Sequence, residues 1–217
     1  MGNMVQLVWQ GLLETLYMTL TTTLLAYLIG LPLGILLVVT DKTGIRPVPV
    51  LSAVVGFVVN ILRSVPFLIL VMALVPLSRL IVGTSIGPSA AIVGLTVAAA
   101  PFVARLVESS LKEVDPGVVE AAQSMGASLW TIIFKVLVSE AKPSLLVGAS
   151  VSVITILGYS AMAGILGAGG LGDIAIRYGW YKYDSVTMWS VVLVIVVVVQ
   201  ILQEIGMRIA KATDNRA

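Results

Sequence analysis

The 217-residue sequence contains no cysteine and no histidine. These absences exclude disulfides, thiolate and imidazole catalysis and the usual zinc sites, so we expect no metal site and no cofactor bound by this chain. Only 11% of the residues are charged, whereas about a quarter of an average soluble protein is charged. The basic residues are scattered and form no stripe with interleaved aromatics, which argues against a nucleic-acid partner.

Apolar residues make up 59% of the chain. Several uninterrupted apolar runs reach the roughly 20 residues that a helix needs to cross a lipid bilayer. Short polar segments separate these runs and leave no room for a sizeable soluble domain. We therefore predict an all-α membrane protein whose residues 1–217 form a single transmembrane domain.

Five transmembrane helices are expected. No Lys or Arg precedes Lys42, so the first run lacks the basic start of a signal peptide and is interpreted as a retained span with its amino end outside. The run over 47–82 is too long for one span, and we interpret 48–62 as an interfacial or lead-in helix. The predicted spans are 15–40, 64–82, 89–109, 143–166 and 186–206, and 110–142 is predicted to be a cytoplasmic loop.

The distribution of Lys and Arg sets the predicted orientation. With five spans, ten basic residues fall inside or near the inner ends and three fall outside, as the positive-inside rule requires. The inner residues are Lys42, Arg46, Arg63, Arg105, Lys112, Lys135, Lys142, Arg208, Lys211 and Arg216, and the outer ones are Arg79, Arg177 and Lys182. The carboxyl end is then cytoplasmic. If 48–62 were a full span, loop 110–142 would face outward, which the charge bias disfavours.

One polar stretch in this loop carries its own helix signals. Asp115 is a preferred N-cap, Pro116 fits the first helical position, and Gly126 supplies a left-handed residue that ends a helix. A helix of about ten residues is only about 15 Å long, half of what a membrane crossing requires. The stretch therefore predicts a short helix outside the bilayer.

This short helix is predicted to present a face of small and apolar residues. Val118, Ala121, Ala122 and Met125 share a face by helical spacing, and Ser128 can cap a second helix that leads into the fourth span. Such a stiff elbow is suited to lie in a groove on another protein. An ordinary helix hairpin between two spans is the alternative.

The order of residues in the elbow favours docking. Glu120-Ala121-Ala122, Gly126 four residues later and Val136 ten beyond the glycine strongly resemble the EAA loop of ATP-binding-cassette (ABC) importer permeases. The resemblance implies the type I importer fold and a coupling helix that docks into an ATPase subunit. Its contact residues would be Glu120, Ala121, Ala122, Met125 and Gly126. The family pattern usually closes with Leu-Pro, and this chain has Val138-Ser139 instead.

The resemblance covers nearly the whole chain and is closest to the permeases of methionine-uptake transporters. The stretches that carry it are 60–67, 82–87, 99–105, 158–164 and 167–172. It implies a homodimer in the bacterial inner membrane, a pair of cytoplasmic ATPase subunits that hold ATP and Mg, and an external methionine-binding protein or lipoprotein. This chain would be the non-catalytic permease, which moves methionine by alternating access.

Two groups of residues are candidates for the translocation path. Tyr159, Ser160, Met162 and Gly164 are predicted to form part of the path or a gate, with Met162 as an outer gate on the dimer axis or simply a packing residue. Arg63, Ser64 and Pro66 are predicted at the inner end of a span or in the path. For Arg63, snorkelling to the inner interface is favoured over a substrate role.

Other functions remain open. The chain has no GxxxxGK[ST] sequence, so we expect no ATPase activity of its own. Its substrate could be another small amino acid or an osmolyte. A secondary carrier or channel is less favoured, because the chain shows no histidine relay, no ring of charge and no division into inverted repeats. A structural or sensory membrane subunit is a further alternative.

Overall fold

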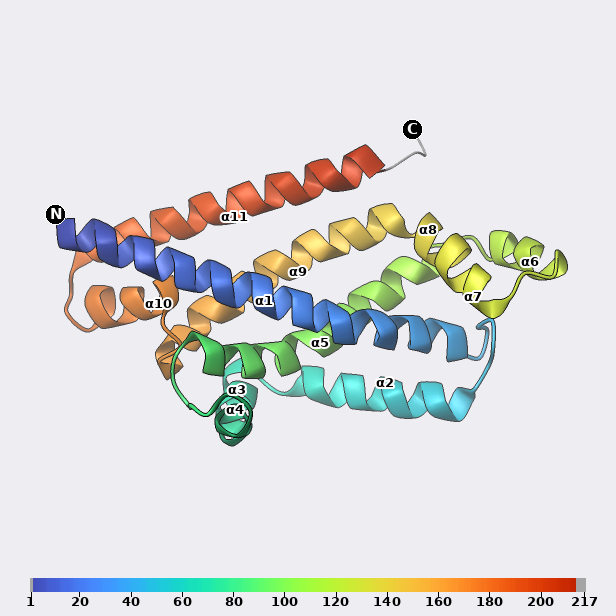
Figure 1. The fold of residues 1–217 in the computed structure, drawn as a ribbon, viewed down its shortest axis with the longest axis horizontal. Coiled ribbons are helices and arrows are strands. Elements are labelled where there is room, and N and C mark those ends of the chain that lie inside the picture. The colour runs from blue at the N-terminus through green and yellow to red at the C-terminus, as the bar shows by residue number, and fades with distance from the viewer. Residues whose placement is uncertain (1, 214–217) are drawn as a thin grey trace.

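The computed structural model describes residues 2–213, which fold into helices joined by turns and contain no strand. Four long helices run along the molecule: α1 (Gly2–Thr40), α5 (Pro88–Lys112), α9 (Lys142–Ala163) and α11 (Ser185–Thr213) (Figure 1). Each is long and apolar enough to cross a membrane. A fifth candidate span combines α2 (Pro49–Ser64) with α3 (Phe67–Ala73), which are bent by 101° relative to each other.

Short elements connect these helices. They are α4 (Val75–Val82), α6 (Pro116–Ser124), α7 (Leu129–Thr131), the π-helix η1 (Ile132–Leu137), α8 (Val138–Glu140), the 3₁₀ turn η2 (Gly164–Leu166), α10 (Gly170–Ile174) and the π-helix η3 (Ala175–Trp180).

The second span differs from the prediction of one helix over 64–82. The chain breaks at Val65 and Pro66, and again at Leu74 between α3 and α4. The segment before the first break, which sequence analysis assigned to an interfacial helix, is α2, and α2 packs lengthwise against α1 and α5 (Figure 1). The bent candidate span therefore includes residues on both sides of the break, and the predicted span 64–82 covers only its second part.

Glycines allow α1 and α5 to approach closely. Gly30 and Gly34 lie one turn apart on α1, in a G-x-x-x-G arrangement that lets helix backbones meet. A Cβ atom on Gly30 would lie 2.7 Å from the Val103 side chain and 2.8 Å from the Ala100 carbonyl oxygen. Gly34 makes the equivalent contact one turn further along α5. Backbone contact at these two positions therefore sets the spacing of α1 and α5.

At the opposite end of α1, two polar side chains hold the glycine-rich segment. The backbone N–H of Gly170 donates to Glu14 Oε2 at 2.7 Å, and that of Leu171 donates to Thr15 Oγ1 at 2.9 Å. Gly169 and Gly170 have φ angles of +82° and +78°, which favour glycine. The acid in the first span is thus a structural group that holds α10.

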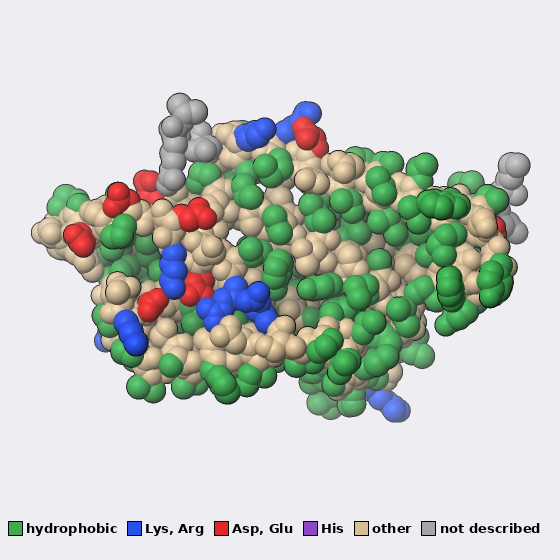
Figure 2. Space-filling model, turned by 180° about the vertical axis from the view of Figure 1, so that it is seen from behind, with side chains coloured by type: hydrophobic (Ala, Val, Ile, Leu, Met, Phe, Trp, Pro, Cys, Tyr) green, Lys and Arg blue, Asp and Glu red, His purple; other side chains and the backbone are tan. Residues whose placement is uncertain are grey.

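Charge divides the molecule into two ends. Charged side chains gather at the end that carries α6, and apolar side chains cover most of the other end (Figure 2). The start of α1 lies at the apolar end, whereas α11 runs towards the α6 side (Figure 1). The charge-bearing connections between α1 and α2 and between α5 and α9 therefore share one end, as expected for five passes. Arg216 lies outside the described residues.

Candidate functional site

Helix α6 has the ends that the sequence predicts. The Asp115 carboxylate accepts the backbone N–H of Gly117 at 2.7 Å, and Pro116 is the first helical residue. Gly126 follows the helix with φ +75°. Ser128 then caps α7, because its hydroxyl oxygen accepts the Thr131 N–H at 3.3 Å. The predicted elbow of two capped helices is confirmed.

The faces of α6 correct one detail of the prediction. Ala122 is buried, and Val119 beside it packs against the core cluster that contains Leu137 and Val114. Ala122 therefore faces the bundle and does not share the outer face with Val118 and Met125. Val119, not identified from the sequence, completes this inner face.

The outer face of α6 presents polar and apolar groups together. Glu120, Ala121 and Gly126 are exposed, and Met125 is 81% exposed. Just beyond, Trp130 and Phe134 are also exposed and stack with ring centres 5.7 Å apart. These large apolar side chains lie at the charged end of the molecule and outside the spans. Such an exposed apolar patch with a polar surround is typical of a protein-docking surface.

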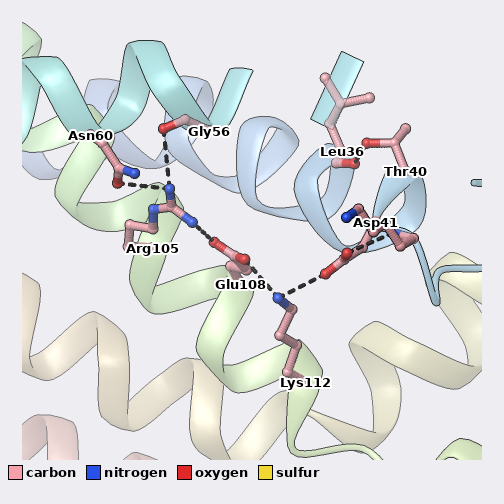
Figure 3. Close-up of polar contacts among 9 residues, drawn as sticks. Leu36, Thr40, Asp41, Gly56, Asn60, Arg105, Glu108 and Lys112 are labelled. Carbon is pink, nitrogen blue, oxygen red and sulfur yellow. Dashed lines mark hydrogen bonds and ion pairs between the residues drawn. The ribbon is translucent and has the colours of Figure 1, made fainter. Parts of the chain in front are cut away.

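A chain of ion pairs holds α5 to its neighbours at this end (Figure 3). Arg105 donates to the Gly56 carbonyl oxygen at 3.2 Å and to Asn60 Oδ1 at 2.8 Å, both on α2. It also pairs with Glu108 at 2.5 Å. Arg105 is therefore a tether between α5 and α2 in this structure.

Glu108 continues the chain towards the end of α1. Its other carboxylate oxygen accepts a hydrogen bond from Lys112 Nζ at 2.9 Å, and Lys112 also forms an ion pair with Asp41 at 3.0 Å. The Lys112 ammonium lowers the pKa of the Asp41 carboxyl, with a smaller contribution from the Lys42 backbone N–H. The turn after α1, which lines a hollow beside α6, is thereby held to α5.

The second candidate region is a hollow at the α2–α3 bend. It has a volume of about 420 Å³ and is lined by the bend, by Ala98 and Phe102 of α5, and by Tyr159 of α9. Arg63, Ser64 and Pro66 all line it, so the structure brings this predicted group together with Tyr159 of the other group. These three residues lie at or just beyond the end of α2 that is furthest from the charged α1–α2 turn.

The four residues predicted on α9 and η2 have different surroundings. The Tyr159 ring stacks on Phe67 with centres 4.4 Å apart. Ser160 is buried and donates to the Leu157 carbonyl oxygen, whereas Met162 is 43% exposed. Gly164 packs so closely on α10 that a Cβ atom would clash with the Asp173 backbone. Gly164 thus makes a helix contact, and of the four only Tyr159 lines the hollow.

Two sets of contacts in these regions were not predicted from the sequence. Phe67 was not singled out, because nothing local indicates that it would meet Tyr159. The Arg105, Glu108 and Lys112 set did carry a signal, since spacings of three and four residues place these side chains on one helix face. Among residues 2–213, no three acidic side chains gather in a group that could hold a metal ion.

This chain matches a known protein family over most of its length. The model of the family "Binding-protein-dependent transport system inner membrane component" matches residues 30–216. The chain belongs to this family. It is therefore the membrane-spanning permease subunit of an ABC importer, a multi-pass membrane protein whose ATPase is a separate subunit.

Named relatives extend over nearly the full length. The probable D-methionine transport system permease protein MetI of Vibrio cholerae is 50% identical over 94% of this chain and 90% of its own. The methionine import system permease protein MetP of Bacillus subtilis is 44% identical over 96% of this chain and 94% of its own.

A solved structure of the MetNI methionine ABC transporter in inward-facing conformations matches the same fold. It superposes with a TM-score of 0.97 and 45% identity, over 99% of this chain and all of that chain. An amino acid ABC transporter at 20% identity and a TM-score of 0.73 shares the fold alone. The predicted type I importer fold is confirmed.

Proposed function

We propose that this chain forms the membrane path of an ATP-driven methionine importer. One observation carries the proposal: full-length relatives named for methionine transport are 44–50% identical to this chain. The composition of the helices agrees, because a methionine side chain is apolar and flexible and crosses most easily between apolar walls. The substrate class thus follows from the relatives, and the physical fit supports it.

The mechanism assigns α6 to coupling. Two cytoplasmic ATPase subunits bind ATP and Mg and close on each other, and each carries an α6 helix of the permease dimer with it. Because Val119 and Ala122 seat α6 on the bundle core, a movement of α6 is transmitted to α5 and α9 rather than lost in a loose loop. The two conformations of the spans then alternate according to the state of the ATPases.

The remaining partners follow from the same proposal. Two copies of this chain enclose the path, and an extracytoplasmic binding protein or lipoprotein delivers methionine at the apolar end. The charged end with α6 and the end of α11 then face the cytoplasm, in keeping with the Lys/Arg excess there. This chain binds no nucleotide itself.

Co-purification tests this proposal directly. The tagged chain is isolated from native membranes in mild detergent, and ATPase activity is measured with and without the methionine-loaded binding protein. We expect an ABC ATPase to accompany the chain and to be stimulated by the loaded binding protein more than by the empty one. If no ATPase co-purifies and the isolated dimer alone passes solute into liposomes, the chain is a carrier or channel.

The substrate is tested in the same preparation. Binding proteins loaded with methionine and a small osmolyte are compared for stimulation of ATP hydrolysis and for uptake into liposomes. Methionine should be accumulated and the osmolyte should not. Accumulation of the osmolyte alone would assign the chain to a different importer.

A further inference from the structure

The hollow at the α2–α3 bend has the size of a small-molecule site. Its volume of about 420 Å³ falls within the roughly 300–1,000 Å³ of ordinary ligand pockets. Its walls come from α2, α3, α5 and α9. Any rearrangement of these helices during transport would therefore change the shape of the hollow.

The hollow holds one charge. Arg63 is the charged residue among its lining residues, and within residues 2–213 its guanidinium makes no ion pair or hydrogen bond. Ionisable residues in membrane-spanning segments are often functional, and Arg63 is exposed in this chain, so it is accessible to a ligand. A guanidinium fork matches the geometry of a carboxylate and can bind it through two parallel hydrogen bonds.

The end of α2 places partial negative charge next to the positively charged Arg63. Helix α2 ends at Ser64, and Val65 turns away in an extended conformation with φ −78° and ψ 127°. Carbonyl groups in the last turn of a helix lack intrahelical partners and carry the negative end of the helix dipole. They are therefore suited to accept hydrogen bonds from an ammonium group a few ångströms from the carboxylate.

An aromatic wall completes the hollow. Phe67 and Tyr159 stack nearly parallel, with an interplanar angle of 10° and ring centres 4.4 Å apart. Phe102 adds a third ring to the lining. Aromatic rings attract both hydrocarbon and thioether groups, so this wall suits an apolar side chain that ends in carbon or sulfur.

We propose that this hollow is a binding site for a zwitterionic, apolar α-amino acid within the membrane domain. The carboxylate pairs with Arg63, the ammonium binds the free carbonyl groups at the end of α2, and the side chain lies against Phe67 and Tyr159. The identity of the substrate as methionine rests on the proposed function. The site gives the permease a selectivity of its own, in addition to that of a binding protein.

Thiol labelling tests occupancy directly, because the chain has no native cysteine. Val65→Cys places a thiol in the lining of the hollow, and Thr84→Cys in the α4–α5 connection is the matched control outside it. Each variant is purified with its ATPase partner in lipid nanodiscs, without ATP or binding protein. Labelling by a charged, membrane-impermeant methanethiosulfonate is then followed with increasing L-methionine.

The expected result is protection of the thiol in the Val65→Cys variant and none in the Thr84→Cys variant. A ligand at about ten times its dissociation constant slows labelling about tenfold, since only the unoccupied site reacts. Methioninol, which lacks the carboxylate, should protect much less, and norleucine should protect about as well as methionine. Failure of the charged reagent to label Val65→Cys means that the hollow faces lipid, and this overturns the proposal. Equal labelling of Val65→Cys with and without methionine also overturns the proposal.

Charge substitutions test the role of Arg63. In the Val65→Cys background, Arg63→Gln should abolish protection by methionine, and Arg63→Lys should retain part of it because the charge remains but the fork is lost. Arg79→Gln, an exposed cation on α4 outside the hollow, should leave protection unchanged. Protection that persists in Arg63→Gln would contradict the proposed carboxylate contact.

The same complex separates this proposal from the proposed function. ATP-driven methionine uptake by the wild-type complex is measured in parallel in liposomes. Uptake by the wild type without protection of the Val65→Cys thiol would overturn the site alone, whereas absence of uptake would overturn the proposed function.

Discussion

Gly30 and Gly158 lie in long helices but have very different surroundings. A Cβ atom on Gly30 would meet Val103 and a backbone carbonyl oxygen of α5 at under 3 Å, whereas one on Gly158 would meet nothing within 4 Å in this chain. The same chemical change therefore tests close packing in one helix and intrinsic helix preference in the other.

We predict opposite outcomes for two glycine-to-alanine substitutions. Gly30→Ala should destabilise the fold by about 1–3 kcal/mol, because α1 and α5 must separate to admit the methyl group. Gly158→Ala should leave stability unchanged or raise it by up to about 1 kcal/mol, because alanine favours the helix. Thermal unfolding in detergent measures both. Equal stability of the two variants would contradict the α1–α5 contact.

Asp41 makes the stability of the fold dependent on pH. Its carboxyl has a lowered pKa because Lys112 donates to it, so the pairing stabilises the fold above the unfolded-state pKa and is lost as the pH falls through the folded-state value. Both side chains are partly exposed, so the contribution is at most about 1 kcal/mol.

Asp41→Asn should therefore lower the Tm slightly at neutral pH. The difference from wild type should stay constant from about pH 5 to 8 and disappear as the pH falls below about 4. Glu204→Gln removes a more exposed pair with Arg208 and should leave the Tm unchanged. A pH-independent effect of Asp41→Asn would show that the ion pair is not its cause.

At the scale of single elements, α6 depends on a left-handed residue at its end. Gly126 has φ +75°, and Gly83 in the α4–α5 connection has φ +77°; neither has an atom within 4 Å of its would-be Cβ. Valine at either position is strained by a similar amount, about 1–2 kcal/mol. The two glycines therefore form a matched pair that differs only in location.

We expect Gly126→Val to reduce methionine uptake per ATP hydrolysed several-fold, because the altered turn misplaces the outer face of α6. Gly83→Val should retain the wild-type ratio. Both variants should insert into the membrane in normal amounts, which immunoblotting of membranes checks. An unchanged ratio in Gly126→Val would count heavily against docking through α6.

The elements that the sequence predicted best are those with local signals. Asp115, Gly126 and Ser128 mark helix ends through contacts within three residues, and the structure confirms each. The inner face of α6 was misassigned at Ala122, because helical spacing groups residues into faces but does not say which face meets the core. That choice depends on Leu137 and Val114, which lie outside α6.

Contacts between segments far apart in the chain could not be predicted from the sequence. The break at Val65 and Pro66 is visible in the sequence, but the 101° bend between α2 and α3 and the packing of α2 against α1 and α5 are not. For the same reason Arg63 was expected at the inner end of a span or in the path, and the hollow that it lines together with Tyr159 emerged only from the fold. Tertiary packing, not local preference, decides both.

At the scale of the whole molecule, the two candidate regions lie apart along α2. The 16 residues of α2 span about 24 Å, with the charged α1–α2 turn at one end and the aromatic hollow at the other. Arg105 holds α2 to α5 between them (Figure 3). The proposed docking surface at the charged end and the proposed substrate site at the bend are therefore linked through the same two helices.

The central claim is that this chain carries methionine only when an ATPase partner does work on it. The most direct measurement is methionine accumulation in proteoliposomes that contain the purified complex, with the loaded binding protein at the apolar end of the permease and ATP on the α6 side. We predict accumulation against a gradient that stops when ATP is withheld. Equal movement of methionine without ATP, or by the permease dimer alone, would contradict the account.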